Sequence, residues 1–155
     1  MSGAEEIAAL DFASVTPEEF ARLVKGLPAK EINRIARDET LRTRVLKEVF
    51  GRVERQFRPD AAGSLEALIR WKVTGQGEIP EAVYETKIAN GTCTVTEGRS
   101  DAEPRLTLVM GDADFLKLVS GNSSPVTLFM TRKVKIAGDV ALAARLTRYF
   151  AIPKA

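Results

Sequence analysis

The chain has 155 residues, which is the size of one domain with a single hydrophobic core. Its 23 Lys and Arg residues nearly balance 21 Asp and Glu residues, and the net charge of +2 gives no reason to expect nucleic-acid binding. Because the sequence has no histidine and one cysteine, it excludes His-dependent triads, His-ligated zinc and internal disulfides, and we expect no metal or cofactor.

The first residues, MSGAEEIAALDF, carry Glu5 and Glu6 where a secretory signal peptide carries positive charge. No apolar run approaches the length of about 18 residues that a membrane-spanning helix needs. We therefore expect a protein that is neither secreted by that route nor membrane-spanning. A reducing cytoplasm fits, since Cys93 has no partner for an internal disulfide.

Three helices are predicted for the first third of the chain. The capping box Thr16-Pro17-Glu18-Glu19 begins a helix that ends at Gly26, a second follows Leu27-Pro28, and a third begins at about Asp38. We expect residues 1–40 to form a helical extension packed on a domain of residues 41–155, with dimerisation through the extension as the alternative. The third helix also carries cations that we interpret as a solvated face: Arg42, Arg44, Lys47, Arg52 and Arg55.

Strands are predicted next, after a loop over residues 59–64. Ile69, Trp71 and Val73 alternate with polar residues, which is typical of a strand with one buried face. Residues 83–89 and 92–97 flank Asn90-Gly91, a strong signal for a hairpin turn, and residues 105–110 form a fourth strand.

The last third returns to helices and adds a fifth strand. We expect Asp112 to cap a helix that ends at Gly121, Ser124-Pro125 to open another, and Asp139 to cap the last. Between them, Val134 and Ile136 alternate with Lys133 and Lys135. The pattern indicates a single α+β domain with five strands.

No constellation of residues typical of catalysis appears. Asp112 and Asp114 lie two apart, but Asp before a helix is far more often a cap than an acid, and Cys93 has no histidine to activate it. The glycines match no phosphate-binding pattern. A binding module is therefore favoured over an enzyme, and an enzyme that uses only carboxylates or lysine is the least favoured reading.

The run from Arg105 to Phe150, which contains DADFLKLVSGNSSPVTLFMTRKVKIAGD and ends RYF, resembles the sterol carrier protein type 2 family. The matching elements are Asp114-Phe115 followed by Leu118 and Gly121, then Pro125, Phe129-Met130, the Lys133–Ile136 strand, Gly138-Asp139 and Leu142. The family often has Gly where Arg132 stands and Gln where Val126 stands. The resemblance reaches back, less clearly, to about Val45.

The resemblance implies a mixed, mostly antiparallel five-stranded sheet with helices on one face and an apolar tunnel between the layers. It implies a non-catalytic protein that binds and moves a sterol, fatty acid or fatty acyl-CoA. The residues expected to line the tunnel are Trp71, Val73, Phe115, Leu118, Val119, Val126, Phe129, Met130, Leu142, Leu146 and Phe150.

The cations of the RKVK segment have two readings. Arg132, Lys133 and Lys135 are either solvated strand positions or contacts for a lipid headgroup, a CoA phosphate or an anionic membrane. For the whole protein, the alternative to lipid transfer is a protein-interaction or oligomerisation domain that keeps the fold and closes the tunnel. We expect a monomer or a weak homodimer.

Overall fold

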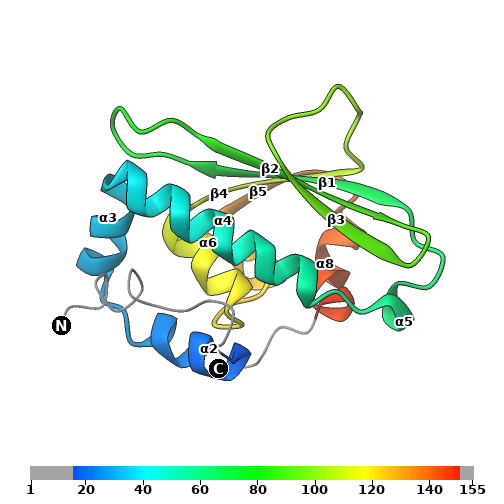
Figure 1. Ribbon diagram of the computed structural model, residues 1–155, viewed down its shortest axis with the longest axis horizontal. Helices are drawn as coiled ribbons and strands as arrows, with labels where there is room; N and C mark the ends of the chain where they lie inside the picture. Colours follow the sequence, from blue (N-terminus) through cyan, green and yellow to red (C-terminus); the bar gives the residue numbers. More distant parts are fainter. Residues whose placement is uncertain (1–15, 151–155) are drawn as a thin grey trace.

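The computed structural model describes residues 16–150, and in it a twisted five-stranded sheet carries helices on one face (Figure 1). The helices are α2 (Pro17–Lys25), α3 (Ala29–Arg37), α4 (Glu39–Arg55), α5 (Pro59–Ala62), α6 (Asp112–Val119), α7 (Pro125–Met130) and α8 (Val140–Tyr149). The strands are β1 (Ala67–Thr74), β2 (Ala82–Ala89), β3 (Thr92–Glu97), β4 (Leu106–Gly111) and β5 (Val134–Gly138).

The sheet is mixed and mostly antiparallel, as predicted. Its strand order is β3-β2-β1-β4-β5, and only the β1–β4 pairing is parallel among the described strands. Alternation along β1 places Ile69, Trp71 and Val73 on the helix-covered face, where all three are buried. The hairpin prediction is confirmed, because β2 and β3 are joined by Asn90 and Gly91, both with the positive φ that a two-residue hairpin turn requires.

Side-chain caps set several helix starts. Thr16, Ser124 and Asp139 each accept a hydrogen bond from the backbone N–H three residues later, and all three were predicted as helix starts. The prediction for Asp112 is wrong. Gly111 is the N-cap of α6, and Asp112 is the first helical residue, buried and paired with Arg42.

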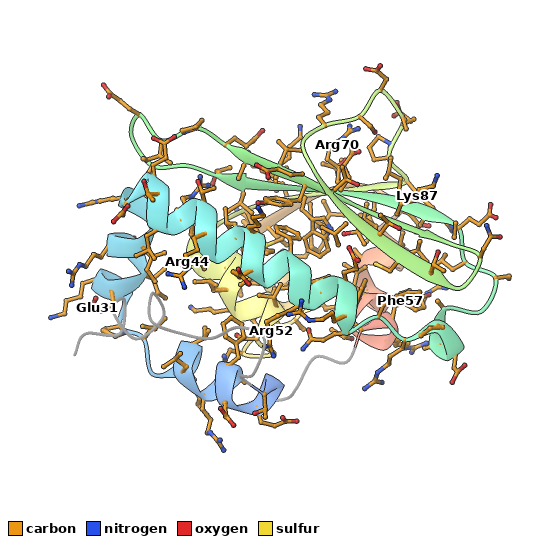
Figure 2. All side chains as sticks on the ribbon, viewed as in Figure 1. Glu31, Arg44, Arg52, Phe57, Arg70 and Lys87 are labelled. Atoms are coloured by element: carbon orange, nitrogen blue, oxygen red, sulfur yellow. The ribbon has the colours of Figure 1, made fainter. Side chains whose placement is uncertain are left out.

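Two further expectations need correction. The predicted loop over residues 59–64 contains the short helix α5, which starts at Pro59 because proline is well suited to the first helical position. The cations of α4 are not a uniform solvated face, because Arg42 and Arg52 are buried. Figure 2 shows Arg52 on the side of α4 that faces α2, where its guanidinium carbon lies 5.4 Å from the centre of the Phe20 ring.

One hydrophobic cluster joins the N-terminal helices to the rest of the molecule. Phe20 and Val24 of α2 and Ile35 of α3 are buried in the same cluster as the sheet residues and α6. The amide of Asn122 adds a polar link, since its Nδ2 donates to the carbonyl oxygen of Ala21 at 3.0 Å. Helices α2 and α3 thus share the core with the sheet-bearing part of the chain.

Candidate functional site

The structure divides the expected tunnel residues into two groups. Eight lie in the hydrophobic core: Trp71, Val73, Phe115, Leu118, Val119, Leu142, Leu146 and Phe150. The other three, Val126, Phe129 and Met130, lie on α7 and are exposed. The eleven residues therefore do not surround one interior space.

Four aromatic rings fill the interior between α4, the sheet and α6. The Phe50 ring centre lies 4.1 Å from that of Tyr84, 4.9 Å from that of Phe115 and 6.0 Å from that of Trp71. The Trp71 indole Nε1 also donates to Thr86 Oγ1 at 2.9 Å, so the polar atom of the ring is satisfied while buried. These contacts join helices α4 and α6 to strands β1 and β2 in the core.

A small apolar hollow lies between α7, β5 and α8. Its volume is about 140 Å³ and its lining side chains are all apolar: Pro125, Val126, Phe129, Ile136, Val140, Ala143 and Ala144. The volume is close to that of cavities of about 150 Å³ that admit one benzene molecule, so the hollow is large enough for the end of an aliphatic chain. It is too small for a whole sterol or long-chain fatty acid.

Around this hollow the protein exposes apolar surface. The exposed large apolar side chains of residues 16–150 are Val126 (48%), Phe129 (48%), Met130 (76%) and Val140 (51%). We call these four residues the α7–α8 patch. Val126, Phe129 and Met130 lie on one face of α7, because residues three and four positions apart are neighbours on a helix, and Val140 begins α8.

The sequence prediction found part of this site and missed the rest. It named Val126 and Phe129 but not Ile136, Val140 or Ala144. The signal was present, since Val140 and Ala144 are four residues apart on α8 and lie off the stripe of Leu142 and Leu146. Only the packing of α8 against α7 makes that second face recognisable as the wall of a hollow.

The turn after α7 has a strained backbone. Arg132 has φ 61, in the left-handed region that L-residues other than Asn and Asp rarely adopt. Glycine, which the resemblance led us to expect at this position, adopts this conformation without strain. Lys133 and Lys135 are exposed, and Val134 is buried, as the alternation predicted.

Two buried ion pairs lie outside the site. Arg42 Nε donates to Asp112 Oδ1 at 2.9 Å, and its other nitrogens donate to the carbonyl oxygens of Val73 and Pro80. Arg70 lies on the opposite face of the sheet (Figure 2). Its Nε donates to Glu85 Oε2 at 2.7 Å. Since each guanidinium is bonded to a carboxylate and to backbone carbonyls, we assign both pairs to structure and not to ligand binding.

Other chemistry is sparse in residues 16–150. Burial raises the pKa of the Cys93 thiol to about 12, with Glu54 adding to the shift, so the thiol is not activated as a nucleophile. The described residues contain no cluster of His, Cys, Asp or Glu that could hold a metal ion. None of their helices is long and apolar enough to cross a membrane.

A model of the SCP-2 sterol transfer family matches residues 46–151. The chain belongs to this family. The matched range begins within α4 and includes the sheet, the hollow and the α7–α8 patch, whereas α2 and α3 precede it. Membership makes lipid binding the function to expect of this domain.

Relatives and solved structures agree with this assignment. The chain is 26% identical over 103 residues to hydroxysteroid dehydrogenase-like protein 2 of Xenopus laevis, covering 66% of the chain and 24% of the frog protein. It is 29% identical over 101 residues to human sterol carrier protein 2, covering 63% of the chain and 18% of that protein. The SCP-2 family chain thus spans a quarter or less of the length of these curated relatives.

The fold is also that of solved family members. The solution structure of palmitated SCP2L2 from Aedes aegypti matches with a TM-score of 0.51 at 18% identity, covering 63% of this chain and 86% of the mosquito chain. At this identity the likeness establishes the α+β fold with its open five-stranded sheet. It confirms the fold class predicted from the sequence.

Proposed function

We propose that this SCP-2 family protein binds a long-chain lipid, a sterol, fatty acid or fatty acyl-CoA, and transfers it between membranes without catalysing a reaction. The observation that carries the proposal is the wholly apolar hollow between α7, β5 and α8, which opens to solvent beside exposed apolar side chains. An apolar chain in such a place contributes about 0.8 kcal/mol per buried methylene. An intracellular, reducing site of action is part of the proposal.

The hollow alone holds only part of such a ligand, so we propose that the remainder of the chain enters between the helices and the sheet. Ala143 lines the hollow and also belongs to the buried core, so one wall of the hollow is the edge of the apolar interior. Entry then requires α7 and α8 to separate from the sheet. The buried residues expected from the sequence, Phe115 and Leu118 among them, become ligand contacts only in that opened state.

The experiment combines ligand identification with a variant that blocks the hollow. Native mass spectrometry and organic extraction of the purified protein should recover a stoichiometric lipid. A fluorescent fatty acid should bind with a dissociation constant near 1 µM, and unlabelled lipid should displace it. Ala144→Phe fills the hollow from an exposed position on α8 and should weaken binding at least tenfold. Thr147→Phe, one turn away and outside the hollow, is the matched control and should bind as wild type.

A second candidate function has its own supporting observation. The packed rings of Phe50, Trp71, Tyr84 and Phe115 favour a protein-interaction or oligomerisation domain with a closed interior. In that case no lipid is recovered, the fluorescent probe does not bind, and Ala144→Phe changes nothing. Absence of any lipid-dependent rise in thermal stability would decide for this alternative.

A further inference from the structure

We propose that the α7–α8 patch and the cations beside it dock the protein on an anionic lipid bilayer, with the exposed side chains of α7 inserted at the headgroup level. This inference names the partner surface of the proposed lipid carrier and rests on that function. The residues changed in its test, Met130 and three cations, do not line the hollow, so the two proposals can fail separately.

The apolar part of the surface is concentrated in one place. The four exposed large apolar residues of the described chain all belong to α7 and the start of α8. Isolated exposed apolar residues are ordinary, but a contiguous group is typical of a surface that meets a protein or a membrane. Met130, the most exposed of them, does not line the hollow, so ligand binding does not account for its position.

The charge around the patch fits an anionic partner. Residues 125–150 contain five cations and one acidic residue. That acidic residue, Asp139, accepts a hydrogen bond from Arg105 Nε at 3.0 Å, so its charge is compensated. From α6, Asp114 and Lys117 line the same depression as Lys133, so their opposite charges offset each other. The surface therefore has an excess of cations beside apolar side chains, which is the combination that favours interfacial membrane binding.

The positions of the cations sharpen the assignment. Arg132 and Lys133 follow Met130 in the turn after α7 and are exposed. Arg148 lies one helical turn after Ala144, a lining residue of the hollow, and so borders the same face of α8. Lys135 alternates with the inward-facing Ile136 and points to the opposite face of the sheet, so we leave it out of the docking surface.

The backbone of Arg132 is an independent observation. A non-glycine residue at φ 61 costs stability, and residues with such strain are enriched at functional sites. Glycine would relieve the strain but would remove the cation next to Met130. Retention of arginine at a position that favours glycine fits a role for its charge.

The test is flotation of the full chain with vesicles of phosphatidylcholine, with and without one third phosphatidylserine, at low and high salt. Binding should need phosphatidylserine and should weaken with salt, because exposed charges are screened beyond about 10 Å at 0.1 M ionic strength. Met130→Ser should weaken binding to the anionic vesicles about tenfold, because the variant lacks the apolar side chain that inserts into the bilayer.

Charge variants complete the experiment. The triple change Arg132→Gln, Lys133→Gln and Arg148→Gln should weaken binding by about fivefold per cation, or roughly 100-fold in all. The matched control changes three exposed lysines on other faces, Lys30, Lys47 and Lys87, to Gln and should keep at least a fifth of wild-type binding. Equal losses in the two triple variants would overturn the proposal.

Other occupants of the patch would show themselves in the same set of variants. If wild type sediments as a dimer that Met130→Ser converts to monomer, and vesicles do not bind, the patch joins two copies and the proposal is wrong. A fall of several degrees in the Tm of Met130→Ser would mean that another part of the chain covers this residue, which also contradicts it. Fatty-acid binding without vesicles should be unchanged in Met130→Ser. If wild type does not bind the fatty acid either, the proposed carrier function fails, whatever the vesicle experiment shows.

Discussion

Two arginines, Arg42 and Arg70, are buried with a carboxylate, but the two carboxylates differ in how many of their oxygens are satisfied. Both oxygens of Glu85 accept hydrogen bonds, from Arg70 and from the Ser100 backbone N–H. In Asp112 only Oδ1 is bonded to Arg42, and Oδ2 has no partner among the described residues. Burial raises the pKa of Asp112, and the Arg42 charge and hydrogen bond oppose this without cancelling it.

The lowered pKa of Glu85 predicts how the stability of the protein depends on pH. Burial alone would raise the pKa of Glu85, but hydrogen bonds from Ser100 and Arg70 outweigh it and lower this pKa. A depressed pKa contributes stability above the unfolded value, about 4.3 for Glu, and this stability is lost as the pH falls through the folded value. The stability advantage of wild type over Glu85→Gln should therefore shrink on acidification, measured by urea unfolding at several pH values. A gap that stays constant with pH would contradict the assignment.

Loss of the Arg42 side chain should be costly. Arg42→Leu leaves the Asp112 carboxylate buried without a cation and removes the donors to Val73 and Pro80, which should lower the free energy of unfolding by about 3–5 kcal/mol. Lys47→Leu, an exposed change on the same helix, is the control and should stay within about 0.5 kcal/mol of wild type. If the two variants unfold at the same urea concentration, Arg42 does not organise the junction of α4, β1 and α6.

Replacing Arg132 should change the stability of the protein as well as its docking on membranes. Arg132→Gly relieves the left-handed backbone and should raise the free energy of unfolding by about 1 kcal/mol. Arg132→Ala removes the same charge and keeps the strain, so it should show no such gain. Urea unfolding of the two variants checks this prediction, and equal stabilities would show that the turn relaxes without glycine.

At the scale of elements, helices α2 and α3 contribute to the core although they precede the residues that the family model matches. Phe20, Val24, Leu27, Ile32 and Ile35 are all buried in the common hydrophobic cluster. Without these helices, the surfaces of α4 and α6 that they cover would face water. Helices α2 and α3 therefore act as a cover for part of the helical layer.

A shortened chain that begins at Asp38 tests this cover. The deletion keeps the residue that caps α4 through its hydrogen bond from the Leu41 N–H. It should lower thermal stability, reduce solubility and increase binding of a dye for exposed apolar surface. The point variant Ile35→Ala is the milder companion and should cost about 2–5 kcal/mol. A shortened protein as stable and monodisperse as the full chain would show that the extension is dispensable.

At the scale of the whole molecule, the relation between the hollow and the packed interior decides how large a ligand can bind. The hollow has room for a short apolar segment, and on the proposed function a longer chain would enter the space that the rings around Phe115 occupy. A long ligand must therefore move α7 and α8 or displace these rings. Trp71, the one tryptophan of the sequence, lies 6.3 Å from Phe115 between ring centres and reports on this movement.

Fatty acids of different length should therefore have different effects on the Trp71 emission. Octanoate should fill the hollow and leave the Trp71 emission unchanged, whereas hexadecanoate should shift it because the longer chain reaches the aromatic cluster. At about 100 times its dissociation constant, hexadecanoate should also raise the free energy of unfolding by about 2.7 kcal/mol. Identical emission spectra with both acids would contradict entry of the chain into the interior.

The sequence by itself determined most of the helices and strands, though not the short helix α5, because their signals are local. The Asn90-Gly91 turn and the caps at Thr16, Ser124 and Asp139 each depend on residues within three positions in the chain. The resemblance over residues 105–150 added the family and the strand arrangement, since that pattern is long and ordered. Side chains whose role depends on distant partners were not predictable in this way.

Only the tertiary structure decided which charged and apolar side chains are covered. Arg42 was expected in solvent but is buried beside Asp112, which lies 70 positions later in the chain. The same contact explains why Asp112 is not the helix cap that was expected. Phe129 and Met130 were expected to line the tunnel but lie on the exposed face of α7, since the core is packed on its other face through Leu128. A helical stripe specifies that one face is apolar, but whether that face meets core, ligand or membrane depends on what the rest of the fold places against it.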